Sequence, residues 1–96
     1  MREVNYDKVP APHMVEGVRH WIEDGLCGDF LRAVVNNDLR EAVARADGTN
    51  VRLIREWVSF FYNEAPSDCW GSPEKAAVWA AARQAVRAAR EANDDA

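Results

Sequence analysis

The chain has 96 residues, of which 48% are hydrophobic and 29% charged, and its formal net charge is −4 at pH 7. This length predicts one domain spanning 1–96, because each half of a divided chain would be too short to bury a core without disulfides or a metal. The acidic balance argues against a non-specific grip on DNA and against strongly acidic substrates, so we expect no direct DNA binding.

Membrane and redox signals are sparse. No apolar run approaches the roughly 18 residues of a membrane helix, and the first residues lack the apolar stretch of a signal peptide. We therefore expect a cytoplasmic protein with no membrane role. Cys27 and Cys69 lie far apart and have no partner at metal-ligand spacing, which favours two free thiols over a disulfide and predicts no metal and no cofactor.

The first predicted helix spans about 12–24, after a polar leader over 1–11. Pro10 and Pro12 resist helix before residue 12 but suit a helix start. Apolar residues then recur on one helical face, and Gly25 follows at a plausible C-terminal cap.

The second predicted helix spans about 29–47, with Asp29 as its N-cap. Asn36, Asn37 and Asp38 interrupt its apolar pattern in mid-helix. At 100° per residue Asp38 lies on the apolar face, where a carboxylate should be paired. Two interpretations stay open: a ligand-facing carboxylate, or a structural group that caps a loop or helix or accepts from a Trp indole.

Two more helices are predicted, over about 50–64 and 73–93, with a frayed tail over 94–96. Apolar side chains cover much of the circumference of 50–64, so several partners must bury it. Ser72 and Pro73 begin the last helix, on which a buried stripe is expected. Its members are Val78, Trp79, Ala82, Ala85, Val86 and Ala89.

No segment alternates as a strand would, and the sequence predicts an all-α, compact four-helix domain. The residues expected in the core come from all four helices. They are Met14, Val18, Trp21, Ile22, Leu31, Val35, Leu39, Ile54, Trp57, Val58, Phe61, Trp79, Ala82 and Val86.

Arg83, Arg87 and Arg90 form a stripe at i, i+4 and i+7 on the last helix. Such a row can bind a phosphate or an acidic partner, or it can be a solvated flank paired with Glu74, Glu91 or acids elsewhere in the chain. Trp70, in the loop before that helix, is either a lid over the core or an exposed anchor for a partner.

His13, Glu16, His20 and Glu23 share one side of 12–24, but the two histidines are about 10 Å apart along the axis, so a solvated face is the better interpretation. The chain has no phosphate loop, no zincin motif and no nucleophile elbow, and we expect a protein that is not an enzyme. The candidate ligand- or partner-binding residues are Asn37, Asp38, Trp70, Arg83, Arg87 and Arg90.

The segment Gly28-Asp29-Phe30-Leu31-Arg32-Ala33-Val34-Val35-Asn36-Asn37-Asp38-Leu39, followed later by Cys69-Trp70-Gly71-Ser72, resembles a family of small uncharacterised proteins encoded by phages and prophages of proteobacteria. The likeness covers roughly 10–80. It implies an intracellular phage product, and by analogy one that acts by binding.

Three functions are therefore expected, in this order. The first is an inhibitor of a host defence complex, similar to an anti-CRISPR protein, that binds a host protein. The second is a binder of a small nucleotide signal, with the arginine stripe holding phosphates. The third is a homo-oligomeric structural accessory protein, and the alanines of the last helix favour a homodimer under any of the three.

Overall fold

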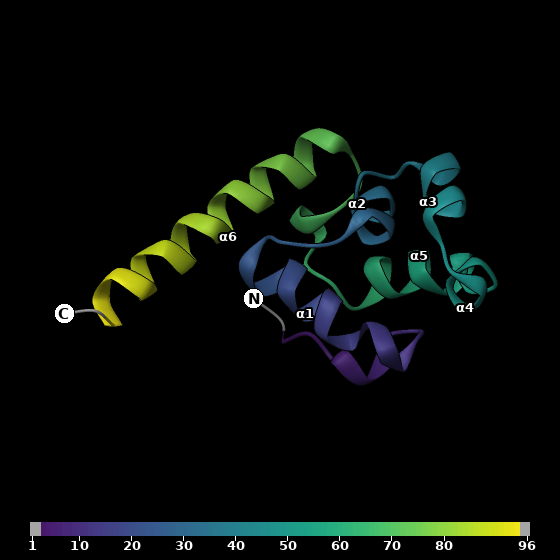
Figure 1. Ribbon diagram of the computed structural model, residues 1–96, viewed down its shortest axis with the longest axis horizontal. Coiled ribbons are helices and arrows are strands. Elements are labelled where there is room, and N and C mark those ends of the chain that lie inside the picture. The colour runs from purple at the N-terminus through teal and green to yellow at the C-terminus, as the bar shows by residue number, and fades with distance from the viewer. Residues whose placement is uncertain (1–2, 95–96) are drawn as a thin grey trace.

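The computed structural model describes residues 3–94, and within them the fold is all-α, with no strand (Figure 1). The predicted all-α fold class is therefore confirmed. The prediction of four helices is not, because the described residues form six α-helices. The α-helices are α1 (Val15–Asp24), α2 (Asp29–Val35), α3 (Leu39–Arg45), α4 (Gly48–Val51), α5 (Ile54–Asn63) and α6 (Pro73–Asp94). Three short 3-10 helices accompany them: η1 (Tyr6–Lys8), η2 (Pro12–Met14) and η3 (Ser67–Cys69).

The segment before α1 is structured and packs on the core. Val9 is 7% exposed and Ala11 is fully buried, although the sequence predicts only a polar leader there. The predicted helix over 12–24 is present as η2 followed by α1. Gly25 ends it in the left-handed conformation, with φ 73°, as expected.

The prediction of one helix over 29–47 is wrong, because the chain breaks into α2 and α3 at Asn36-Asn37-Asp38. Asn37 has φ 60°, which an asparagine tolerates better than most residues. Asp38 then accepts a hydrogen bond from the backbone N–H of Glu41 at 3.1 Å and so begins α3 as its N-cap. The Asn and Asp side chains, which compete for the hydrogen bonds of the helical backbone, therefore end one helix here and begin the next.

The predicted helix over 50–64 is also divided, into α4 and α5. The N–H of Arg52 bonds to the carbonyl of Thr49, and that of Leu53 to the carbonyl of Asn50. These i to i−3 bonds tighten the chain into a turn and change the direction of the helix axis. Asp47 begins α4, because its carboxylate accepts from the N–H of Asn50 at 2.7 Å, and this bond lowers the pKa of Asp47.

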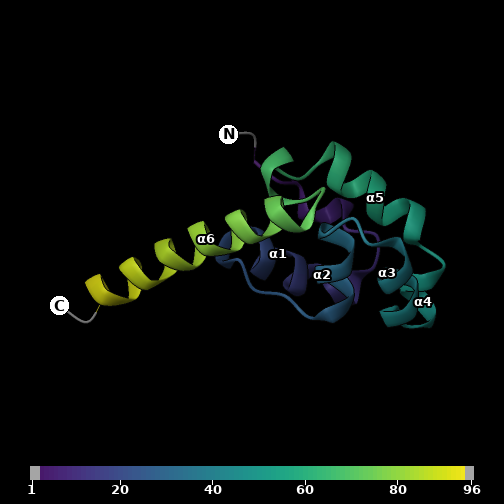
Figure 2. The same cartoon turned by 90° about the horizontal axis from the view of Figure 1, so that it is seen from above.

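The last helix has the predicted extent, but its predicted buried stripe is wrong except for Trp79, which is half-buried and packs against the core. Ala76 and Ala80 are the buried residues of α6, whereas Val78 is 71% exposed and Val86 42% exposed. Gly25 explains why α6 turns Ala80 toward α1: the two backbones are so close there that a Cβ on residue 25 would lie 2.7 Å from the carbonyl oxygen of Ala80. The first half of α6 packs against α1 through these small residues, and the second half extends beyond the rest of the molecule (Figures 1 and 2).

The core lies between α1, α2 and α5. Its seven largest fully buried side chains come from these helices and from η3. They are Trp21, Trp57, Phe61, Leu31, Val18, Val35 and Cys69.

Seven of the fourteen expected core residues are buried, three are half-buried (Met14, Ile54 and Trp79), and four are exposed. The exposure of these four has one cause. Leu39 is 66% exposed and Val58 44% exposed, while Ala82 and Val86 face solvent on α6. Each of these residues continues the apolar pattern of a helix past the edge of its buried face. Periodicity located the apolar face, but the angular position of the neighbouring helices decided which part of it is covered.

Candidate binding surfaces

An apolar groove runs between the α2–α3 pair and α5. The break at Asn37 and Asp38 forms one end of it, so the structure places these two candidate residues together. The groove is small, about 40 Å³, far below the several hundred Å³ of a typical nucleotide pocket. Its lining comprises Ala33, Val34, Asn37, Asp38, Leu39, Ala42, Ile54, Trp57 and Val58.

Asp38 is exposed and acts as a helix cap, so the expectation that it lies on a buried apolar face is wrong. Of the two open interpretations, the structural one accounts for its hydrogen bond to α3. One carboxylate oxygen accepts from the N–H of Glu41, and the side chain lies at the end of the groove.

Large apolar side chains surround this groove on the solvent side. Leu39 and Val43 lie one turn apart on α3, and Val58 and Tyr62 lie one turn apart on α5. Tyr62 is 78% exposed, Leu39 66% and Val43 46%. Of these four side chains, Leu39 and Val58 line the groove, and Val43 and Tyr62 are their neighbours one turn further along. We call the four side chains and the groove the α3–α5 surface.

Two arginines flank the α3–α5 surface. Arg40 lies three residues before Val43 on α3, and Arg55 three residues before Val58 on α5. Both are exposed, and neither has an ion pair within residues 3–94. The sequence analysis missed this surface because it assigned Leu39 and Val58 to the core. The polar run at 36–38, between two apolar segments, is the feature of the sequence that could have indicated the break between α2 and α3.

Trp70 closes one side of the core, as the lid interpretation has it. Its ring centroid lies 5.8 Å from that of Phe61, and its side chain is half-buried. The adjoining carbonyl of Cys69 accepts from Trp21 Nε1 at 3.0 Å, and the N–H of Gly71 donates to the carbonyl of Val35 at 2.8 Å. These bonds hold the loop against α1 and α2, so that the Trp70 side chain covers the core beside Phe61.

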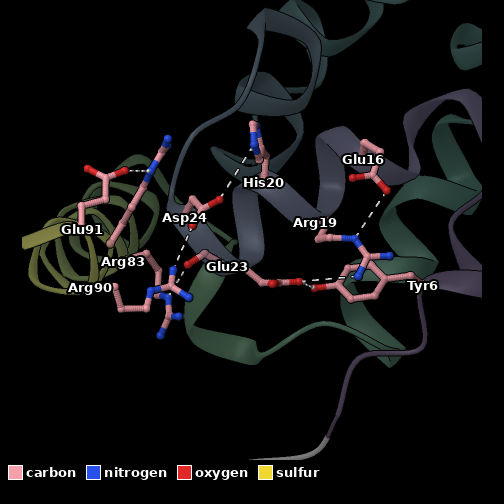
Figure 3. A network of polar contacts seen from close by, with 10 residues as sticks. Tyr6, Glu16, Arg19, His20, Glu23, Asp24, Arg83, Arg90 and Glu91 are labelled. Atoms are coloured by element: carbon pink, nitrogen blue, oxygen red, sulfur yellow. Dashed lines mark hydrogen bonds and ion pairs between the residues drawn. The ribbon is translucent and has the colours of Figure 1, made fainter. Parts of the chain in front are cut away.

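The arginine stripe of α6 binds the C-terminal end of α1 (Figure 3). Arg83 Nε donates to the carbonyl of Glu23 at 2.9 Å, and Arg90 pairs with Asp24 at 3.2 Å. Arg87 pairs with Glu91 at 3.1 Å, as the solvated-flank interpretation expects. Cations at a helix C-terminus also interact favourably with the helix dipole. The guanidinium groups therefore already have partners, which weakens the case for a phosphate site.

A second, wider cleft of about 450 Å³ lies between the N-terminal segment, α1 and α6. Tyr6 on its wall donates to Glu23 at 3.1 Å, and Arg19 lies over the Tyr6 ring at 4.5 Å (Figure 3). Burial, followed by the charge of Glu23, raises the pKa of Tyr6 to about 12. Sequence analysis missed Tyr6, because an isolated aromatic residue in a polar segment carries no periodic signal.

Neither the histidines nor the cysteines form a reactive group. His13 contacts Asp47 at 3.0 Å and His20 contacts Asp24 at 3.9 Å. No group of three or more His, Cys, Asp or Glu side chains within residues 3–94 is arranged to hold a metal ion. Both cysteines are free, as predicted, and burial raises the pKa of each thiol, that of Cys69 to about 12. Thiols in that state are poor nucleophiles at neutral pH.

None of the helices in the described part of the chain is both long and apolar enough to cross a membrane. No protein-family model, curated protein or solved structure matches this chain.

Proposed function

We propose that this chain is a small accessory protein of the phage type that acts in the cytoplasm of a host cell by binding a host protein. The observation that carries the proposal is the α3–α5 surface, where Leu39, Val58 and Tyr62 are exposed beside an apolar groove. Large exposed apolar side chains beside an apolar groove are typical of a protein-binding site. Aromatic and arginine side chains, here Tyr62 with Arg40 and Arg55, are enriched in such sites.

The proposed partner is a component of a bacterial defence complex, and the proposed effect is inhibition without catalysis, as in an anti-CRISPR protein. The resemblance to phage-encoded proteins supports this choice. The two raised thiol pKa values also support a role in binding rather than in nucleophilic catalysis.

The test is affinity capture from host lysate, followed by native mass spectrometry of the recovered complex. The wild-type chain and two variants are compared: Tyr62→Glu on the α3–α5 surface, and Ala88→Glu on α6 as the matched control at another exposed helical position. We expect one stoichiometric protein with the wild type and with Ala88→Glu, and its loss with Tyr62→Glu, because a charge is desolvated in the interface. Recovery of no stoichiometric protein, or equal recovery by Tyr62→Glu, would contradict the proposal.

The nucleotide-signal alternative has less support, because Arg83, Arg87 and Arg90 are engaged by Glu23, Glu91 and Asp24. A thermal-shift screen with linear and cyclic nucleotides distinguishes the two functions. A rise in Tm with any nucleotide would favour the alternative.

We also propose that the chain is a homo-oligomer. The exposed apolar side chains on α6, Val78 and Val86, support this.

A further inference from the structure

The helix α6 has two faces of different character. Ala76 and Ala80 are buried against the rest of the molecule. On the opposite face, counted at 100° per residue, Val78 is 71% exposed and Val86 42% exposed, and three exposed alanines lie between or beside them. Those alanines are Ala82, Ala85 and Ala89. No charged residue shares this face between residues 78 and 89, and we call it the outer face of α6.

The outer face is long and accessible. A helix of 22 residues is about 33 Å long at 1.5 Å per residue. Its first half packs on α1, and the second half, although Arg90 still reaches Asp24, extends away from the other helices in both views (Figures 1 and 2). A single helix of that kind gains little stability by itself in water, so a surface that buries the outer face would stabilise it.

We propose that the outer face of α6 binds the outer face of α6 in a second copy of this chain, with the two helices antiparallel and the two-fold axis next to Ala82. The inference rests on the proposed homo-oligomer and says which surface forms it. Val78 and Val86 are each four residues from Ala82. An axis at Ala82 therefore places Val78 of each copy beside Val86 of the other, as the self-complementary interface of a two-fold dimer requires.

Small residues at the axis make close contact feasible. With Ala82 and Ala85 at the centre, the two backbones can approach closely, as they do between Ala80 and Gly25 within one chain. A groove of about 450 Å³ also runs beside Val78, Trp79 and Ala82. The antiparallel arrangement puts Val86 of the second copy over this groove.

Charge favours the antiparallel over the parallel arrangement. Glu74 and Arg90 are each eight residues from Ala82, and Asp68 lines the same groove as Glu74. Antiparallel helices bring Glu74 of one copy to the level of the other copy's Arg90, whereas parallel helices would bring like charges together. The contribution is modest, because Lys75 lines the same groove and Arg90 also pairs with Asp24 of its own chain. In the antiparallel arrangement, helices α1 to α5 of one copy also lie at the opposite end of the α6 pair from those of the other copy.

Sedimentation equilibrium of the full chain at micromolar concentration tests the proposal, with Val78→Asp, Val86→Asp and the control Ala77→Asp. Ala77 is exposed on α6 but lies off the outer face. We expect a species of twice 10.8 kDa for the wild type and for Ala77→Asp. Each valine substitution should weaken association about tenfold or more, because it buries a charge. Circular dichroism shows whether each variant keeps its helices, as exposed positions should.

A disulfide locates the axis independently. In a Cys27→Ser background, Ala82→Cys should form an intermolecular disulfide in a glutathione buffer, while Ala77→Cys should not, because only cysteines with nearby Cα atoms can be bridged. A wild-type chain that sediments only at 10.8 kDa would overturn the homo-oligomer and this interface together. A dimer that survives both valine substitutions, or that cross-links equally through residue 77, would overturn this interface alone.

Discussion

Trp57 Nε1 donates a hydrogen bond to the side-chain oxygen of Asn50 at 3.1 Å inside the core. Asn50 is 2% exposed, and among the described residues no buried side-chain nitrogen or oxygen lacks a partner. The bond therefore joins α4 to α5 across the turn that divides them. It also explains why a polar residue is tolerated there, since the indole N–H needs an acceptor once it is buried.

Replacement of Asn50 by Ala should lower the free energy of unfolding by about 1–3 kcal/mol, because it leaves the indole N–H of Trp57 buried without a partner. Urea denaturation measures the loss. Thr49→Ala, at the exposed neighbouring position, is the control and should change stability by less than about 0.5 kcal/mol. Equal stability of the two variants would mean that the bond contributes nothing.

Trp57→Ala should be more damaging, with a loss of about 3–5 kcal/mol, because it empties a fully buried site that also contacts Phe30 and Phe61. Tyr62→Ala, on the same helix but 78% exposed, serves as the comparison and should melt close to the wild type. A Trp57→Ala variant with the wild-type Tm would show that α5 does not anchor the core.

Two glycines of the α1 region should respond in opposite directions to alanine. Gly25→Ala should destabilise the chain, because φ is 73° and the added Cβ would meet the Ala80 carbonyl oxygen at 2.7 Å. Gly17→Ala should stabilise it, by up to about 1 kcal/mol, since Gly17 lies inside α1 with nothing within 4 Å of the added carbon. Thermal melts followed by circular dichroism measure both, and a stabilising Gly25→Ala would refute the close approach of α6.

Stability should fall as the pH rises above 9. The pKa of Cys69 is raised from 9.0 to about 12, mainly by burial, and that of Tyr6 from 10.0 to about 12. Groups with a raised pKa hold their protons longer in the folded state, so their contribution is complete below the unfolded values and is lost as the pH approaches 12. Urea denaturation at pH 8 and near pH 11 measures the decline, which Cys69→Ala combined with Tyr6→Phe should reduce.

The two thiols should differ in their rate of alkylation. Cys27 is half-buried, whereas Cys69 is fully buried, and burial raises its pKa further. At pH 8 iodoacetamide should modify Cys27 first, and Cys69 should react only when the chain unfolds. Peptide mass spectrometry after timed quenching gives the order. Rapid labelling of Cys69 in the folded chain would show that the loop carrying Trp70 opens readily.

Local chemistry at helix ends was readable from the sequence. Pro12, Gly25 and Pro73 each act on the backbone within one turn, and the limits of η2 and α1 taken together, and those of α6, agree with the prediction. The breaks at 36–38 and 52–53 were missed for a different reason. At 36–38 the polar side chains interrupt the apolar pattern and can cap or turn the backbone, whereas at 52–53 the pattern continues through the turn. In both places the choice between a helix and a break depends on which packing arrangement the neighbouring helices allow.

By itself the sequence determined the helical class of this protein and the apolar face of each segment, because helical periodicity is a property of neighbouring residues. The tertiary structure alone decided which part of each face is covered. Ala76 and Ala80 face α1 because Gly25 permits close contact there, so Val78 and Val86 remain outside. The same is true of Leu39 and Val58, whose exposure depends on the angle between α3 and α5. That angle is set by contacts between distant residues, which no local pattern encodes.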